Sequence, residues 1–228
     1  MSHAPADGQT LFVINPNSTA AVTHGIDAAM APLRMAGGPA IECLSLPSGP
    51  PGIQTQQDVD SVAPQLVSLA RSLRPRAAGF VIACYSDPGL HAVREAVDVP
   101  VLGIMESGVL TALTLGQRFG VIAILQGSIA RHLRAYGAMG VQSRLAGELA
   151  IGLNVTELAQ YERTLARMTE VGRRLRDEQG ADVIVMGCAG MAAYREPLQQ
   201  ALGMPVVEPS QAAVAMAIGR IRMNWHGA

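Results

Sequence analysis

Short apolar runs alternate with longer segments of helical periodicity along the whole chain. The run LFVIN at residues 11–15, for example, is typical of a buried strand. Such alternation favours parallel strands joined by crossover helices, and therefore an α/β fold. The pattern predicts strands near residues 11–15, 40–46, 78–84, 100–104, 119–125, 141–145, 182–187 and 205–207.

The clearest helix signal spans residues 155–179. Asn154 followed by Glu157 resembles a capping box, apolar residues then recur at helical spacing, and Gly180 ends the pattern. By contrast, SLPSGPPGIQT at residues 45–55 is rich in proline and glycine, which predicts a loop. Its length suits either a plain surface connection or a flap over a pocket.

The sequence also repeats at long range. Aligning GFVIACYSDPG with DVIVMGCAGMA puts Cys84 on Cys188, 104 residues later, and Pro100 then falls on Pro205 at nearly the same offset. This repeat predicts two pseudo-symmetric halves, each a mostly parallel four-stranded sheet flanked by helices. We expect a first lobe of residues 1–105 plus 208–228 and a second lobe of residues 106–207, with the active site in the cleft between them.

The amino-acid composition narrows the range of possible binding partners. The chain has 228 residues, 49% of them hydrophobic, and a formal net charge of −1 without a basic cluster, which disfavours nucleic acid and anionic membranes as partners. A small molecule is the expected partner. No apolar run approaches the ~20 residues of a membrane span, and the start MSHAPADGQT lacks a signal-peptide pattern, so we expect a cytoplasmic protein.

Two residue types carry chemical information. The sequence contains no lysine, which excludes the Schiff base of pyridoxal phosphate enzymes and the lysine of a phosphate-binding P-loop. Its three cysteines form no CxxC pair and fit reduced thiols better than disulfides or structural zinc. No cofactor is expected.

Cys84 and Cys188 each end a predicted strand and precede a predicted helix. Open α/β sheets bind ligands at the carboxyl ends of their strands, and a helix N-terminus is expected to lower the pKa of a nearby thiol from ~8.5 toward neutrality. Two thiols on opposite sides of a cleft suit a two-base racemisation, in which one removes a proton and the other supplies one to the opposite face. Backbone amides after each cysteine would hold the enolate oxygen.

Other chemistries fit these residues less well. Cys43 lies in an alternating strand and is interpreted as a packing residue. A nucleophilic pair of Cys84 with His91 is a weaker alternative, because His91 is expected to be solvated about one helical turn away. The histidines lack metal-ligand spacing, so no metal site is predicted; they are His3, His24, His91, His132 and His226.

The first predicted strand runs into NPNST at residues 15–19. Asn17 or Ser18 would cap the following helix. Asn15 stands at the end of the strand, beside the expected end of the Cys84 strand, and offers both a donor and an acceptor to a carbonyl-amide substrate. We therefore rank Asn15 second to the two thiols as a site residue.

With VINPNST at 13–19, CYSDPGL at 84–90 and GCAGM at 187–191, the chain resembles the hydantoin and allantoin racemase group of the aspartate/glutamate racemase superfamily. The resemblance spans essentially the whole chain. It implies two α/β halves, cofactor-independent proton transfer next to a carbonyl, catalysis by Cys84 and Cys188, and a homo-oligomer. It also implies that a cyclic ureide or amide substrate is bound by Asn15, Ser18, Tyr85, Ser86, Ala189 and Gly190.

Some positions depart from the pattern of related enzymes. Amino-acid racemases of the superfamily typically carry Cys-Asn-Thr and Cys-Thr where this chain has Cys-Tyr-Ser and Cys-Ala-Gly, a less polar lining that suits a neutral cyclic amide. Ser86 stands where hydantoin racemases usually have a small residue or glycine, and Gln126 or Ser128 replaces a usual threonine. The alternatives are an amino-acid racemase, a decarboxylase or isomerase of the same fold, and a two-lobed binding module with inert thiols.

Overall fold

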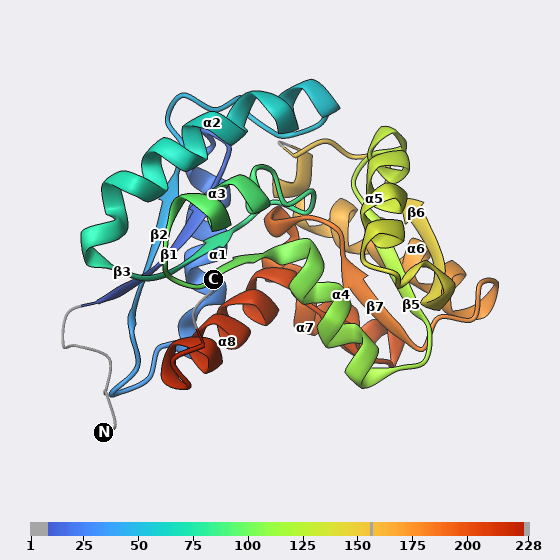
Figure 1. Ribbon diagram of the computed structural model, residues 1–228. Helices are drawn as coiled ribbons and strands as arrows, with labels where there is room; N and C mark the ends of the chain where they lie inside the picture. The colour runs from blue at the N-terminus through green and yellow to red at the C-terminus, as the bar shows by residue number, and fades with distance from the viewer. Residues whose placement is uncertain (1–8, 156, 226–228) are drawn as a thin grey trace.

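The computed structural model describes residues 9–155 and 157–225 and contains two four-stranded parallel sheets side by side (Figure 1). His3, His226 and most of the segment MSHAPADGQT lie outside these ranges. The first sheet has the order β2-β1-β3-β4 and the second the order β6-β5-β7-β8. The strands are β1 Thr10–Asn15, β2 Ala40–Ser45, β3 Ala77–Ile82, β4 Val101–Gly103, β5 Phe119–Ala123, β6 Leu145–Ala150, β7 Val183–Met186 and β8 Val206–Val207. The predicted α/β fold with two similar halves is confirmed.

Helices flank both sheets. They are α1 Ala20–Ala29, α2 Gln56–Leu73, α3 Leu90–Ala96, α4 Ile104–Leu115, α5 Gln126–Ala138, α6 Tyr161–Asp177, α7 Arg195–Leu202 and α8 Pro209–Arg222, with short 3₁₀ helices at Ala31–Leu33, Arg74–Arg76, Gln142–Arg144, Glu157–Ala159 and Ala189–Tyr194. The last helix, α8, packs against β1, β3 and β4 of the first sheet and against α4. Within the described ranges, no helix has both the length and the apolar character to cross a membrane.

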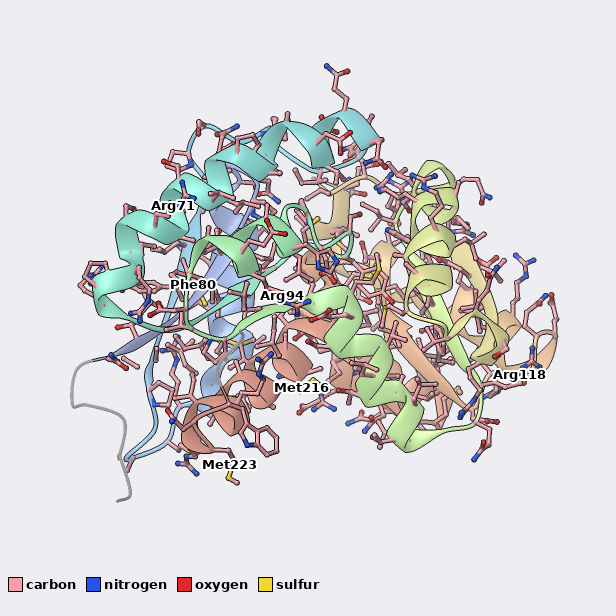
Figure 2. The ribbon with its side chains drawn as sticks, in the orientation of Figure 1. Arg71, Phe80, Arg94, Arg118, Met216 and Met223 are labelled. Atoms are coloured by element: carbon pink, nitrogen blue, oxygen red, sulfur yellow. The ribbon has the colours of Figure 1, made fainter. Side chains whose placement is uncertain are left out.

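Central strands form the core because helices cover both of their faces. Every residue of β1 and β3 is buried, as expected for inner strands of a parallel sheet. Phe12 and Phe80 are register partners on these strands, and their rings stack 5.8 Å apart. Each such buried phenylalanine contributes about 1.5–3 kcal/mol of hydrophobic stabilisation. Figure 2 shows Phe80 within the first sheet and Arg94 beside α4, where its Nη1 donates to Glu106 Oε2 over 3.2 Å.

Two boundaries differ from the predictions. The strand expected at 141–145 is β6 at Leu145–Ala150, because residues 142–144 form a 3₁₀ turn instead. The capping box does form, with Asn154 N–H donating to Glu157 Oε2 over 2.9 Å and Glu157 N–H to Asn154 Oδ1 over 3.1 Å. It closes a 3₁₀ turn in which Leu158 is buried, however, so α6 begins only at Tyr161.

Candidate active site

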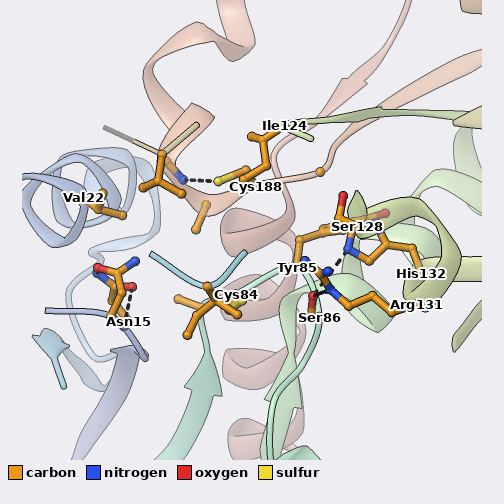
Figure 3. A pocket seen from close by; sticks show the side chains of 17 residues that line it. Asn15, Val22, Cys84, Tyr85, Ser86, Ile124, Ser128, Arg131, His132 and Cys188 are labelled. Carbon is orange, nitrogen blue, oxygen red and sulfur yellow. Dashed lines mark hydrogen bonds between the residues drawn. The ribbon is translucent and has the colours of Figure 1, made fainter. Parts of the chain in front are cut away.

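A cavity opens between the two sheets at the carboxyl ends of their inner strands (Figure 3). It is a narrow cavity of about 40 Å³ that is partly open to solvent. Cys84 follows β3 of the first sheet and Cys188 follows β7 of the second, and both line this cavity. The sequence repeat therefore brings the two thiols to one space from opposite halves.

Burial controls the ionisation of both thiols. It raises the pKa of Cys84 to about 12 and the pKa of Cys188 to about 11, from an ordinary 9.0. The charge of Cys188 raises the pKa of Cys84 further, whereas the backbone N–H groups of Ser86 and Gly190 act in the opposite direction on Cys84 and Cys188. The predicted lowering of the thiol pKa is wrong, because α3 starts only at Leu90 and one N–H donor does not offset desolvation.

Cys188 is the N-cap of the 3₁₀ helix Ala189–Tyr194. The N–H of Gly190 donates to its Sγ over 3.4 Å. Ala189 and Gly190 both line the cavity, as substrate-binding residues would. A Cβ on Gly190 would lie 3.1 Å from a methyl of Leu158 and 3.6 Å from the Cys188 sulfur, so this turn accepts only a small residue without rearrangement.

The first strand brings Asn15 to the cavity but leaves Ser18 outside its lining. Asn15 is buried beside the end of β3, and its Nδ2 donates to Asn17 Oδ1 over 2.9 Å and to Thr23 Oγ1 over 3.0 Å. Ser18 is exposed and does not line the cavity, because the turn directs Asn17 inward instead. Asn17 Oδ1 also accepts from Thr19 N–H and holds this turn. The prediction that Asn17 or Ser18 caps α1 is wrong, because the helix begins one residue later with Thr19 as its N-cap.

Asp87 lies in the turn before α3 but does not cap that helix, whose N-cap is Gly89. Its two carboxylate oxygens accept from the backbone N–H groups of Met105 and Glu106 over 2.9 and 3.0 Å, at the start of α4. Burial raises the pKa of Asp87 to about 7, against the effect of these two hydrogen bonds. α3 begins after Gly89, whose φ of +64° ends the tight turn that follows Asp87. The Cys84 turn is thus fastened to the segment where the chain passes between the sheets.

Tyr85 and Ser86 both line the cavity and contact α5 of the other half. Arg131 and His132 of α5 also line it, and neither was identified from the sequence. Arg131 Nε donates to Ser86 Oγ over 3.0 Å, and the rings of Tyr85 and His132 meet edge to face at 5.3 Å. His24 and His91 are exposed, as expected for His91, whereas His132 is buried.

The sequence contains a pattern that indicates this face of α5. His132 and Tyr136 are four residues apart in a helical pattern and share one face of α5. Which way that face points depends on tertiary packing, and the spacing expected of metal ligands does not reveal it. Of the two residues proposed to replace the usual threonine, Ser128 lines the cavity and Gln126 is exposed.

The proline- and glycine-rich segment between β2 and α2 borders the cavity. Ile53 is buried in the cavity lining, and Gln54 O accepts from Arg131 Nη1 over 3.1 Å. Ser18 N–H donates to Pro50 O over 3.0 Å at the other end of the segment. These contacts favour the flap interpretation over a plain surface connection.

Comparison with known proteins gives the family. The model of the Asp/Glu/hydantoin racemase family matches residues 11–217. The chain belongs to this family. A hydantoin racemase from a Pseudomonas species is 34% identical over 207 residues, covering 90% of this chain and 83% of the relative.

Solved structures of the family agree with this assignment. An allantoin racemase from Klebsiella pneumoniae is 30% identical with a TM-score of 0.88, covering 96% of this chain and 90% of that one. The allantoin racemase of Pseudomonas fluorescens is 25% identical with a TM-score of 0.92, covering 96% and 94%. These likenesses support a racemase, and hence an isomerase, that acts on a small molecule.

Proposed function

We propose that this protein racemises 5-substituted hydantoins or allantoin by proton transfer between two thiols, without a cofactor. The observation that carries the proposal is the presence of Cys84 and Cys188 in one cavity, at equivalent strand ends of two similar sheets. The substrates named for the similar racemases are cyclic ureides. In this proposal residues 1–105 with 208–228 form the first lobe and residues 106–207 the second; a homo-oligomer stays a prediction.

In the proposed mechanism one thiol is ionised and the other is protonated. The charge of Cys188 raises the pKa of Cys84, so the two thiols are not ionised together. For one enantiomer the Cys188 thiolate removes the proton from the carbon next to the substrate carbonyl, leaving an enolate and a Cys188 thiol. Cys84 then gives its proton to the opposite face and becomes the thiolate. The other enantiomer reacts in the reverse direction.

Negative charge in the cleft has two sources of stabilisation. The N–H groups of Ser86 and Gly190 approach the two sulfurs, and the charge of Arg131 favours the ionised form of Cys84. The same donors suit an enolate oxygen, whose charge develops next to the thiols. Arg131 therefore joins the residues that we assign to the site.

Exchange in heavy water tests this function. A single enantiomer of a 5-substituted hydantoin or of allantoin should lose its optical rotation in the presence of the enzyme and acquire deuterium at the stereocentre. Polarimetry and mass spectrometry measure the two changes on the same sample. If a panel of hydantoins and allantoin shows neither change, the proposal is wrong.

A second candidate is an amino-acid racemase of the aspartate/glutamate type. The observation in its favour is the guanidinium of Arg131 on the cavity wall, since guanidinium groups pair with carboxylates. Two of its donors already bind Ser86 and Gln54, which favours the neutral ureide. The same exchange measurement with enantiopure aspartate and glutamate distinguishes the two candidates.

A further inference from the structure

Polar side chains of the second half converge on Ser86 of the first half. Arg131 Nε donates to Ser86 Oγ over 3.0 Å, and His132 Nε2 lies 3.4 Å from the same oxygen (Figure 3). Ser86, Arg131 and His132 all line the cavity that holds the two thiols. The proposed function assigns Ser86 to the substrate without saying which substrate group it meets.

A buried carboxylate behind this wall sets the direction of the hydrogen bonds. Glu148 of β6 is buried, and its Oε1 lies 2.6 Å from Nδ1 of His132, which is 3% exposed. A carboxylate oxygen accepts, so the tautomer with its hydrogen on Nδ1 is the one that donates to Glu148. In that tautomer Nε2 has a lone pair, which accepts the hydrogen of the Ser86 hydroxyl.

Two tyrosines extend the same chain of hydrogen bonds. The hydroxyl of Tyr136 lies 3.2 Å from Glu148 Oε2 and 3.4 Å from the hydroxyl of Tyr85. The O–H of Tyr136 is directed at both groups, so the Tyr85 hydroxyl accepts from it. Tyr85 and Ser86, the two residues after Cys84, are therefore both linked to Glu148 through hydrogen bonds.

This arrangement leaves Ser86 as an acceptor toward the substrate. Its hydrogen is directed to His132 and one lone pair accepts from Arg131, which leaves the second lone pair for a donor in the cavity. Beside it, the guanidinium of Arg131 supplies N–H donors. An acceptor next to a donor is complementary to an N–H group next to a carbonyl.

We propose that Ser86 and Arg131 recognise an N–H and the adjacent C=O of the substrate's ureide, with His132 and Glu148 as positioning residues that keep Ser86 an acceptor. The proposal rests on the proposed function and adds the group that is recognised. A ring held by its N–H and C=O edge keeps its place while the hydrogen at the stereocentre moves from one face to the other.

N-methylation of the substrate tests the recognition. A 5-substituted hydantoin, its N1-methyl isomer and its N3-methyl isomer are compared by kcat/KM for deuterium exchange in heavy water. With the unaltered enzyme, at least one methylated isomer should be about 10- to 100-fold poorer than the parent, because the lone pair of Ser86 then has no donor.

Two variants show whether Ser86 and Glu148 cause the difference in kcat/KM between the parent and the methylated hydantoins. In Ser86→Ala the parent should lose about 10-fold or more in kcat/KM and the penalised methyl isomer should change little, so the ratio falls toward 1. Glu148→Gln keeps the size of the side chain but no longer fixes the hydrogen on His132 Nδ1, and the ratio should fall there as well. A partly unfolded variant would lower both rates equally and leave the ratio unchanged.

Arg134→Met is the matched control on the same helix. Arg134 is exposed, donates to Gln56 Oε1 over 2.9 Å and does not line the cavity, so the ratio should keep its original value. Equal rates for the parent and both methylated substrates, or an unchanged ratio in Ser86→Ala and Glu148→Gln, would overturn the ureide recognition alone. No exchange with any hydantoin or with allantoin would overturn the proposed function itself.

Discussion

The turns after Cys84 and Cys188 occupy equivalent places in the two sheets but are built differently. After Cys84, Tyr85 and Ser86 carry hydroxyl groups, and Ser86 is bonded to the opposite half through Arg131. After Cys188, Ala189 and Gly190 leave little beyond backbone, and the N–H of Gly190 points at the sulfur. The repeated fold thus supplies two thiols in one cavity. In our proposal, a single side of the cleft supplies the side chains that orient an unsymmetrical substrate. A racemase needs both, because its two substrates differ only in which face carries the hydrogen.

Removing either thiol should have the largest effect. Cys84→Ser and Cys188→Ser should each lower racemisation by about 10²- to 10⁴-fold, since a serine hydroxyl is a poor proton carrier in this role. Each variant should keep some deuterium exchange from one enantiomer only, and the two should differ in which enantiomer that is. Chiral chromatography combined with mass spectrometry measures this. Normal racemisation by both variants would contradict the two-thiol mechanism.

The pH dependence should show that the two thiols share one charge. With pKa values of about 11 and 12, the singly ionised pair becomes about tenfold more abundant for each unit that the pH rises toward 11. We therefore expect kcat/KM to rise with a slope near 1 in log units between pH 7 and 10, after subtraction of the uncatalysed rate. A plateau beginning near pH 7 would mean that a thiolate already forms there.

Replacing Arg131 should affect the turn after Cys84, which it contacts through Ser86, and not the turn after Cys188. Arg131→Met removes the cation that favours ionisation of Cys84 and the donor to Ser86, and should lower kcat/KM by about 10- to 100-fold. Arg134→Met, one turn further along α5, is the control and should retain normal kinetics. Equal losses in both variants would point to the stability of α5 instead, which thermal unfolding would show.

A smaller effect is expected at Gly103, which lies against Asp87. A Cβ at this position would overlap the Asp87 carboxylate and displace it from the start of α4. Gly103→Ala should lower the free energy of unfolding by about 1–3 kcal/mol, measured by urea denaturation. The control Gly219→Ala on α8 meets no atom within 4 Å and should raise it by about 0.5–1 kcal/mol. Similar results for both would show that Asp87 adjusts without loss.

The sequence predicted those parts of the structure that depend on local pattern and repetition. The two sheets, the strand ends that carry Cys84 and Cys188, and the inner position of the Asn15 strand all follow from apolar runs and a shared offset. The orientation of α5 and the start of β6 depend on packing between distant segments, so Arg131 and Glu148 could not be assigned. The sign of the thiol pKa shift was missed because it depends on burial, which a helix-terminus argument leaves out.

The two sides of the cleft differ in how they are joined. On one side of the cavity, behind the thiols, the chain itself connects the two sheets, through α4 after β4 and through α8 after β8, and α4 packs against α8. Asp87 also accepts a hydrogen bond from the start of α4 on this side. In front, Arg131 and Arg134 of α5 meet Gln54 and Gln56 through side-chain hydrogen bonds. Widening the front breaks only side-chain contacts, whereas widening the back would deform the backbone. The backbone therefore fixes the width of the cleft behind the thiols, whereas side-chain hydrogen bonds alone fix it at the front.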